Sequence, residues 1–268
     1  MLKDRKNYSD SMLSTTVTII GSGTCVPSLR RSACSVLIEM HHQKLLFDCG
    51  PGTMRRLLEA GIAIFDLTYL FLSHFHPDHT SELVPLLFAT KYPDGNQRQK
   101  PLTLIGGQGI ASFYDGLRAV YRDWIELAPG QLHIRELPPR RGVALELENF
   151  RVQASPVEHN PESMAFRVDT PDGKAVVYSG DTDFSPNLVD LARGADLLIC
   201  ESAFPDADKV PGHLSPSTAG EIARQAHVAR LVLTHFYPVC DQADLIGECR
   251  RTYDGPLVLA EDLLKLRL

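Results

Sequence analysis

The segment 70–79, LFLSHFHPDH, joins an apolar run to a dense group of ionisable residues. His74, His76 and His79 lie within six residues, with Asp78 among them, although the chain has only 10 histidines. At the end of an extended strand, His74 and His76 point to the same side, and Asp78 and His79 follow where the chain turns into a helix. This order can present four ligands around one cavity. Imidazole and carboxylate groups suit zinc, iron or manganese.

Three distant segments offer partners for this cluster. His159 follows a strand-like run in SPVEHN, Asp181 follows one in VVYSGDT, and His235 follows one in LVLTHF. Each is a single polar ligand at the carboxyl end of an apolar run, the edge where open α/β folds build their sites. Taken singly, these are ordinary loop, turn and strand-ending residues, and Asp78 or Thr80 is an ordinary helix N-cap. Their combination favours a metal site.

The remaining pattern predicts an α/β protein. Strands are predicted at 16–20, 34–39, 44–48, 67–73, 101–106, 131–135, 143–155, 164–169, 174–179, 195–200, 229–235 and 256–260. Helices are predicted at 54–61, 81–92, 109–121, 186–193, 217–228 and 241–251. PDG at 171–173 predicts a turn. No repeat or linker divides the chain, so we expect one domain over 15–268 after a loose tail of residues 1–14.

Composition narrows the function classes. No apolar run approaches the roughly 20 residues of a membrane span, and no signal peptide is visible, so we expect a cytoplasmic protein. The 6 cysteines form no CxxC pair, which predicts reduced, buried or neutral thiols. A net charge of −6 argues against a broad nucleic-acid surface. It does not exclude a small phosphoester, because metal ions supply positive charge locally.

With these residues in view, the chain resembles a known family. HFHPDH is similar to the HxHxDH signature of the metallo-β-lactamase superfamily, and FDCG, EHN, SGDT and THF resemble its other motifs in the same order, over about residues 16–261. GSGTCVPSLRRSACSVLIE, LLFDCGPGTMRRLLEAG, PLTLIGGQGI and ESAF followed by GHLSPSTAGEIA resemble its ribonuclease Z-like branch. The resemblance implies an αββα four-layer sandwich of two mixed β-sheets flanked by helices.

The resemblance also implies a site with two divalent metal ions, zinc in the first place and manganese or iron as alternatives. The ligands that it implies for the first ion are His74, His76 and His159. Those for the second ion are Asp78, His79 and His235, with Asp181 bridging the two. Asp48 in FDCG matches a residue that orients a histidine ligand rather than binding metal.

The implied mechanism is that of a phosphodiesterase using a metal-bridging hydroxide. Two ions about 3.5–4 Å apart lower the pKa of a shared water towards 7 and neutralise the phosphoryl group. His213 in GHLS matches the proton donor to the leaving oxygen, and Glu201 in ESAF is placed to orient it. With Asp78, which is also a ligand, these are the candidate catalytic residues.

Alternatives stay open. Transfer-RNA-processing ribonuclease Z has a flexible RNA-binding arm between the motifs matched by His159 and Asp181, where only 21 residues stand here. The family's basic residue after the last histidine is also missing. We therefore expect a small phosphodiester or RNA as substrate, and tRNA 3′-end processing is the first alternative. Hydrolysis of lactones, thioesters or sulfate esters, a non-catalytic metal-binding scaffold or sensor, and a homodimer are further alternatives that the family offers.

Several conspicuous residues receive ordinary interpretations. The other histidines are expected on the surface: His41, His42, His133 and His227. The basic stretches 91–100 and 138–141 are expected to be solvated loops rather than substrate-binding patches.

Overall fold

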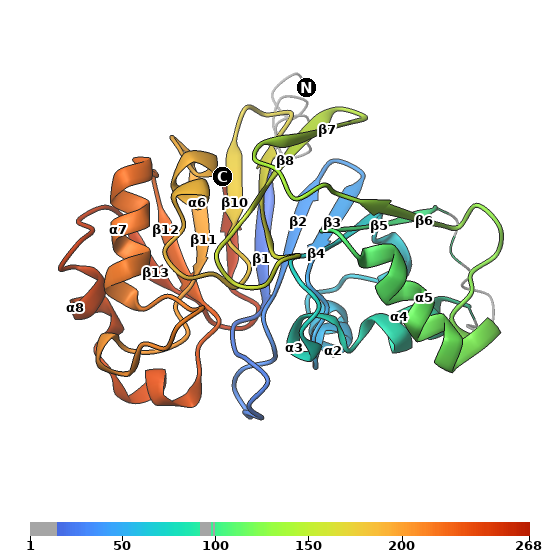
Figure 1. Cartoon of the computed structure of the whole chain (residues 1–268), viewed down its shortest axis with the longest axis horizontal. Helices are drawn as coiled ribbons and strands as arrows, with labels where there is room; N and C mark the ends of the chain where they lie inside the picture. The colour runs from blue at the N-terminus through green and yellow to red at the C-terminus, as the bar shows by residue number, and fades with distance from the viewer. Residues whose placement is uncertain (1–14, 92–97, 99) are drawn as a thin grey trace, which may run out of the picture.

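The computed structural model describes residues 15–91, 98 and 100–268. The predicted tail, 1–14, and residues 92–97 and 99 of the basic stretch 91–100 lie outside this described part. Within it, two seven-stranded β-sheets pack against each other and helices cover their outer faces (Figure 1). The predicted αββα sandwich of two mixed sheets is confirmed.

The first sheet is built mainly from the N-terminal half of the chain. Its strands, in spatial order, are β14 (Lys265–Arg267), β1 (Thr16–Gly21), β2 (Ser35–Met40), β3 (Gln43–Phe47), β4 (Tyr69–Leu72), β5 (Leu102–Gly106) and β6 (Leu132–Glu136). Strands β14 to β3 pair antiparallel, whereas β3 to β6 pair parallel. The parallel strands β3 and β4 therefore end at the same edge of the sheet.

The second sheet follows along the chain. Its strands, in spatial order, are β13 (Leu257–Leu259), β12 (Leu231–Thr234), β11 (Leu197–Glu201), β10 (Ala175–Tyr178), β9 (Met164–Asp169), β8 (Phe150–Pro156) and β7 (Val143–Leu147). Strands β10 to β13 are parallel, and β7 to β10 are antiparallel. Their nearly continuous apolar sequences are typical of parallel strands that are covered on both faces.

The interface between the sheets forms one core, and the outer face of the first sheet forms another. Phe47 and Phe71 stack with ring centroids 4.7 Å apart, and Phe71 meets Phe166 of the second sheet at 5.2 Å. On the outer face, Leu46 and Leu70 belong to a separate buried cluster with the covering helices. Burial on both sides fixes the strand ends that carry the polar residues.

The helices connect and cover the strands. The α-helices are α2 (Thr53–Glu59), α3 (Pro77–Thr80), α4 (Leu83–Lys91), α5 (Ile110–Tyr121), α6 (Pro186–Leu191), α7 (Pro216–Ala226) and α8 (Leu245–Cys249). Short 3₁₀ helices are η1 (Ile64–Asp66), η2 (Arg122–Trp124), η3 (Asp206–Asp208) and η4 (Pro238–Gln242). Among the described residues, no helix is long and apolar enough to cross a membrane.

The structure differs from the predicted elements at three places. The strand predicted at 143–155 is a hairpin, because Glu148 and Asn149 form a turn between β7 and β8. The helix predicted at 241–251 is divided into η4 and α8, since Asp244 caps a new helix through Gly247 N at 2.9 Å. Strand β14 was not predicted, because its three residues carry two charges and no apolar run.

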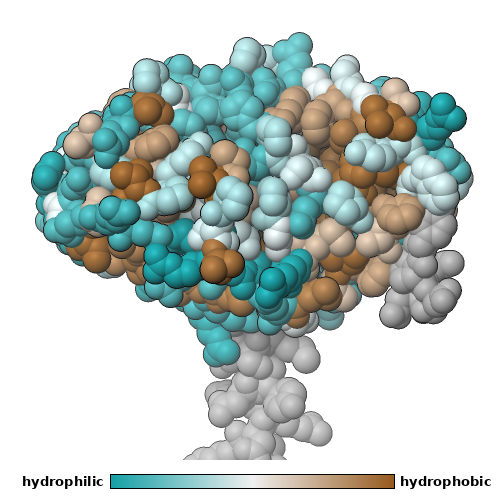
Figure 2. Space-filling model, turned by 90° about the horizontal axis from the view of Figure 1, so that it is seen from below, coloured by the Kyte–Doolittle hydropathy of each residue, from teal (hydrophilic) through white to brown (hydrophobic). Residues whose placement is uncertain are grey.

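The surface agrees with most of the ordinary interpretations of single residues. Arg98 of the stretch 91–100 is the exception, because it is buried and donates hydrogen bonds to the carbonyl oxygens of Leu67 and Ile64 rather than lying in a solvated loop. The four histidines predicted to lie outside the site are exposed, as is the stretch 138–141. Cys25 is exposed and the other cysteines are buried, all of them as free thiols. Viewed from below, the surface is largely hydrophilic on one side and more apolar on the side of α4 and α5 (Figure 2).

Candidate metal centre

All of the predicted metal ligands meet at the lower edge of the two sheets, where β4 runs on towards α3 (Figure 1). Ligand atoms within 4.8 Å of one another form three groups: His74, His76, His159 and Asp181; Asp78, His79 and His235; and Asp181, His213 and His235. The first sheet supplies one contiguous segment to these groups. His159, Asp181 and His235 follow separate strands of the second sheet, and His213 lies in the loop before α7. Except for His76, which is exposed, the members are buried or partly buried.

Backbone geometry brings the contiguous segment against the end of β3. Cys49 N donates to His79 O at 2.7 Å, and Asp48 N donates to Phe71 O at 2.8 Å. A Cβ atom at Gly50 would lie 1.7 Å from Asp78 O, so only glycine fits there. Asp48 itself adopts φ +61°, a conformation that non-glycine residues rarely take and that often marks functional sites.

Asp48 organises the first half of the site. Its carboxylate is fully buried and accepts hydrogen bonds from Ser73 N at 2.7 Å, Ser73 Oγ at 2.7 Å, Tyr178 OH at 2.6 Å and His79 Nδ1 at 2.8 Å. Because His79 Nδ1 donates to a carboxylate, its Nε2 faces the site. This is the orienting role predicted for Asp48, with Ser73 and Tyr178 as further partners.

Two other histidines are held in the same way. His159 Nδ1 lies 2.8 Å from the carbonyl oxygen of Gly212, which can only accept, so the proton is on Nδ1 and Nε2 keeps the lone pair of a ligand. Ser73 Oγ donates to Asp48 and therefore accepts from His74 Nδ1 at 3.0 Å. Burial, together with the neighbouring His79, lowers the pKa of His74, which favours its neutral form.

Asp181 lies between the histidine groups. Its Oδ1 is 3.3 Å from Nε2 of both His79 and His235, whereas its Oδ2 is 3.7 Å from Nε2 of His74 and 4.0 Å from Nε2 of His159. Each carboxylate oxygen therefore faces a different group. A carboxylate in this orientation can bind two cations at once.

Buried charges of opposite sign shift the ionisation of this site. Burial by itself raises the pKa of Asp181 and of Asp78, but His235 and His79 beside them lower both pKa values below the usual range. Burial lowers the pKa of His79, yet Asp181 and Asp48 on its two sides raise it well above its usual value. A divalent cation would replace the proton on His79 Nε2, since a metal-bound imidazole is neutral.

A second pair, His213 and Glu201, lies beside the ligand groups, and His213 also belongs to the third of them. His213 Nδ1 is 2.9 Å from Glu201 Oε1, and that oxygen also accepts Thr182 N at 2.9 Å. Burial lowers the pKa of His213, but the hydrogen bond and charge of Glu201 outweigh it and raise the pKa. Glu201 is buried, while the side chain of His213 is partly exposed.

The residues present suit divalent cations. Among the described residues, His74 Nε2 and Asp181 Oδ1 are buried polar atoms without a hydrogen-bond partner, and so is His235 Nδ1. His79 Nε2 and His235 Nε2 approach to 3.3 Å, although at most one proton can lie between them. Native proteins rarely leave such atoms unsatisfied, and a cation coordinated by imidazole and carboxylate would satisfy the ligand atoms that face the site.

The sequence motifs did not reveal every residue that holds the site. The Gly212 carbonyl fixes His159, but a backbone acceptor leaves no trace in the residue type, and only its place before His213 in GHLS was a signal. Asp78 and Thr80 are not N-caps, because α3 begins at Pro77 with His76 as its cap residue and no side-chain cap.

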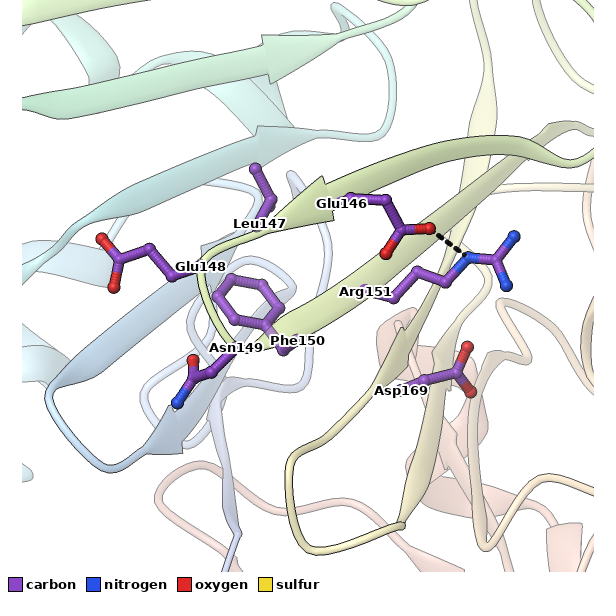
Figure 3. A pocket seen from close by; sticks show the side chains of 7 residues that line it. All are labelled: Glu146, Leu147, Glu148, Asn149, Phe150, Arg151 and Asp169. Atoms are coloured by element: carbon purple, nitrogen blue, oxygen red, sulfur yellow. Dashed lines mark ion pairs between the residues drawn. The ribbon is translucent and has the colours of Figure 1, made fainter.

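A cavity of about 420 Å³ elsewhere on the surface does not share this chemistry. It lies at the β7–β8 hairpin, and Glu146 and Arg151 on its wall form an ion pair at 3.1 Å (Figure 3). No histidine or cysteine lines it among the described residues. It therefore lacks the imidazole ligands that the histidine cluster provides.

The chain is similar to named proteins over nearly its whole length. Residues 43–236 match the family described as the Beta-lactamase superfamily domain. Ribonuclease Z of Mycobacterium sp. (strain KMS) is 30% identical over 276 residues, covering 94% of this chain and 95% of that protein. Ribonuclease Z of Methanosarcina mazei is 29% identical over 308 residues, covering 94% and 97%.

Solved structures agree. Human tRNase Z, short form, superposes with a TM-score of 0.78 at 26% identity, covering 94% of this chain and 98% of that one. The metallo-β-lactamase fold protein YhfI of Bacillus subtilis gives a TM-score of 0.79 at 24% identity, covering 95% and 99%. The chain therefore belongs to the metallo-β-lactamase superfamily, as its motifs indicated. It is a metal-dependent hydrolase.

Proposed function

We propose that this hydrolase is a dinuclear phosphodiesterase. The observation that carries the proposal is the position of Asp181, whose two carboxylate oxygens face two separate histidine groups. Such an arrangement supports a pair of cations sharing one carboxylate. Two-metal sites are typical of enzymes that cleave phosphate esters.

The proposed ligands follow the observed groups. His74, His76 and His159 would hold one ion, Asp78, His79 and His235 the other, and Asp181 both. Zinc is the proposed ion because imidazole nitrogen and carboxylate oxygen are its usual ligands, and manganese or iron are the alternatives that the same ligands accept. A cytoplasmic location, expected from the composition, and a homodimer, which the family offers, stay predictions.

Two divalent ions held there would lower the pKa of an attacking water and offset negative charge on the phosphoryl group. The protein's own side chains then act on the leaving group. His213, protonated on Nε2, donates that proton to the leaving oxygen, while Glu201 holds Nδ1 and favours the charged imidazole. Asp48 keeps His79 in the orientation that directs Nε2 into the site.

The first test compares ester classes on metal-loaded protein. We expect bis-p-nitrophenyl phosphate to be cleaved faster than a p-nitrophenyl thioester or a lactone. Hydrolysis of the lactone or thioester with no cleavage of the diester would replace a phosphodiesterase by another hydrolase of the superfamily. A sample that binds about two equivalents of zinc and cleaves nothing would favour the metal-binding scaffold.

A second candidate is tRNA 3′-end processing, favoured by the 30% identity to a ribonuclease Z over 94% of the chain. The structure between His159 and Asp181 is β9, a turn and β10, with no inserted arm. RNA binding would therefore depend on other surfaces. Precursor tRNA cut at the end of the acceptor stem, at rates far above those of small diesters, would make this candidate the primary function.

A further inference from the structure

Asp183 stands one residue beyond the SGDT motif and receives donors from a distant loop. Its carboxylate accepts Lys209 Nζ at 2.9 Å and Gly212 N at 3.1 Å. Its backbone N donates to Glu158 O at 2.7 Å. Asp183 is not in any of the described groups of ligand atoms. It thus joins the loop before His159 to the loop before His213 without being a metal ligand.

The loop that Asp183 holds, residues 205–213, carries two groups of the site. The Gly212 carbonyl accepts His159 Nδ1, and His213 follows directly. Apart from η3, this loop has no regular structure, so side-chain contacts have to position it. Gly212 has φ +85°, and a Cβ there would lie 3.3 Å from His159 Nδ1. Gly212, whose carbonyl orients His159, is therefore tightly placed, and Asp183 accepts a hydrogen bond from the backbone N–H of this same residue.

We propose that Asp183, together with Lys209, is a positioning residue that clamps the 205–213 loop to the metal centre. The clamp keeps the Gly212 carbonyl on His159 Nδ1, and so keeps His159 Nε2 directed at one of the two cation positions. It also holds His213 beside Glu201. This role rests on the proposed dinuclear site, and it assigns a task to two residues outside the family motifs.

A second aspartate–lysine pair, Asp196 and Lys174, lies at the start of β10, the opposite end of this strand from Asp183. Asp196 accepts Lys174 Nζ at 3.0 Å and Ala175 N at 2.9 Å, where β10 begins. Asp196 and Asp183 therefore each bind one lysine and one backbone N–H. The side chain of Asp196 is 32% exposed and that of Asp183 is 31% exposed. No ligand group contains Asp196 or Lys174 among the described residues. Variants of Asp196 thus control for the loss of an ion pair as such.

The decisive measurement is stepwise zinc affinity by competition with a chromogenic chelator. We expect Asp183→Ala to weaken one of the two zinc ions by about 10–100-fold, the usual cost of losing an outer partner of a ligand histidine, and to leave the other unchanged. Only one group contains His159, which explains the asymmetry. Asp183→Asn keeps an acceptor for Gly212 N and should lose less. Asp196→Ala should change neither affinity.

A second measurement, kcat for two kinds of leaving group, distinguishes a displaced loop from a general loss of structure around the site. In Asp183→Ala, kcat for a diester with a poor leaving group should fall more than kcat for one that releases p-nitrophenolate, because His213 is also displaced. Equal weakening of both ions, or affinities that match those of Asp196→Ala, would overturn the proposal. If Asp183→Ala does not fold, Lys209→Met and Lys174→Met repeat the comparison. A wild type that binds two zinc ions but cleaves no diester refutes the proposed function alone, since the affinities stay readable.

Discussion

The two sheets supply the site in different ways. The first contributes one contiguous segment, His74 to His79, anchored on the fully buried carboxylate of Asp48. The second contributes isolated residues at the ends of separate strands, such as His159 and Asp181, and holds them through loops. The first half rests on a fully buried carboxylate, whereas in the second half His159 is held through a loop whose own partners are partly exposed.

Because of this difference, a substitution at Asp48 should affect the stability of the whole fold, whereas one at Asp183 should affect only the position of a loop. A change at the buried anchor disturbs packing and ligands together, because the same carboxylate binds a core tyrosine and a site histidine. A change at Asp183 disturbs a loop whose partners are partly exposed.

The largest effect is expected for Asp48→Ala. Removing this carboxylate leaves Tyr178 OH, Ser73 and His79 Nδ1 without their buried acceptor. The unfolding free energy should fall by about 3–5 kcal/mol, as for other broken buried charge networks, and zinc binding should fail as well. Urea denaturation of wild type and variant measures it. A variant that loses zinc at full stability would contradict the idea that this half belongs to the core.

Asp181→Ala should spare the fold and disable both cation positions. Its two oxygens face the two histidine groups, so its loss should weaken both zinc ions at once and abolish hydrolysis. Competition with a chelator measures both affinities in one titration. Loss of a single ion would mean that Asp181 does not bridge. Asp196→Ala serves as the control for removing an aspartate next to the same strand.

His213→Ala should leave both zinc ions bound and slow turnover by about 10²–10⁴, the usual range for losing a general acid. His213 is not among the proposed ligands, and its Nδ1 lies 2.9 Å from Glu201 Oε1 but 4.0 Å from Asp181 Oδ2. The defect should shrink for esters that release p-nitrophenolate, because that oxygen needs little proton transfer. A variant that loses zinc, or slows every leaving group equally, would show that His213 is a ligand or a packing residue.

The same contrast explains what the sequence could predict. HFHPDH was visible because His74, His76, Asp78 and His79 occupy adjacent positions after an apolar strand. The single residues of the second sheet were found only because each follows an apolar run and matches a motif in order. Asp183 gave no signal, since its partners Lys209 and Gly212 N are distant in sequence and an aspartate after a strand is ordinary.

The fold was predictable to a similar degree. Buried parallel strands such as β11 and β12 have continuous apolar sequences, so their existence was clear. The turn at 148–149 and the edge strand β14 were missed, because tertiary pairing rather than local preference produces them. PDG at 171–173 predicted its turn, and Gly173 has φ +77°, but its link to the start of the chain needed the structure.

The smallest effect on stability is expected for the contact between Asp172 of this turn and Thr15 at the start of the described chain. Asp172 in this turn accepts Thr15 N at 2.9 Å and Thr15 Oγ1 at 2.8 Å, which ties the β9–β10 turn to the start of β1. Burial raises the pKa of Asp172, but hydrogen bonds from Thr170 and Thr15 outweigh it and lower the pKa. A lowered pKa in the folded state adds stability above the ordinary carboxyl pKa and loses it as the pH falls towards the folded value.

Asp172→Asn should therefore cost less than about 1 kcal/mol at pH 7, because the position is exposed and solvent screens the interaction. The difference from wild type should shrink only as the pH falls below the ordinary carboxyl pKa of about 4, towards the lowered pKa of the folded wild type. Urea midpoints across this range measure it, with Asp254→Asn, at another exposed position, as the control for lost charge. Zinc affinity and turnover should not change, because the tie joins the two sheets at the end opposite the metal centre. A pH-independent difference would mean that Asp172 acts through the turn alone and not through its charge.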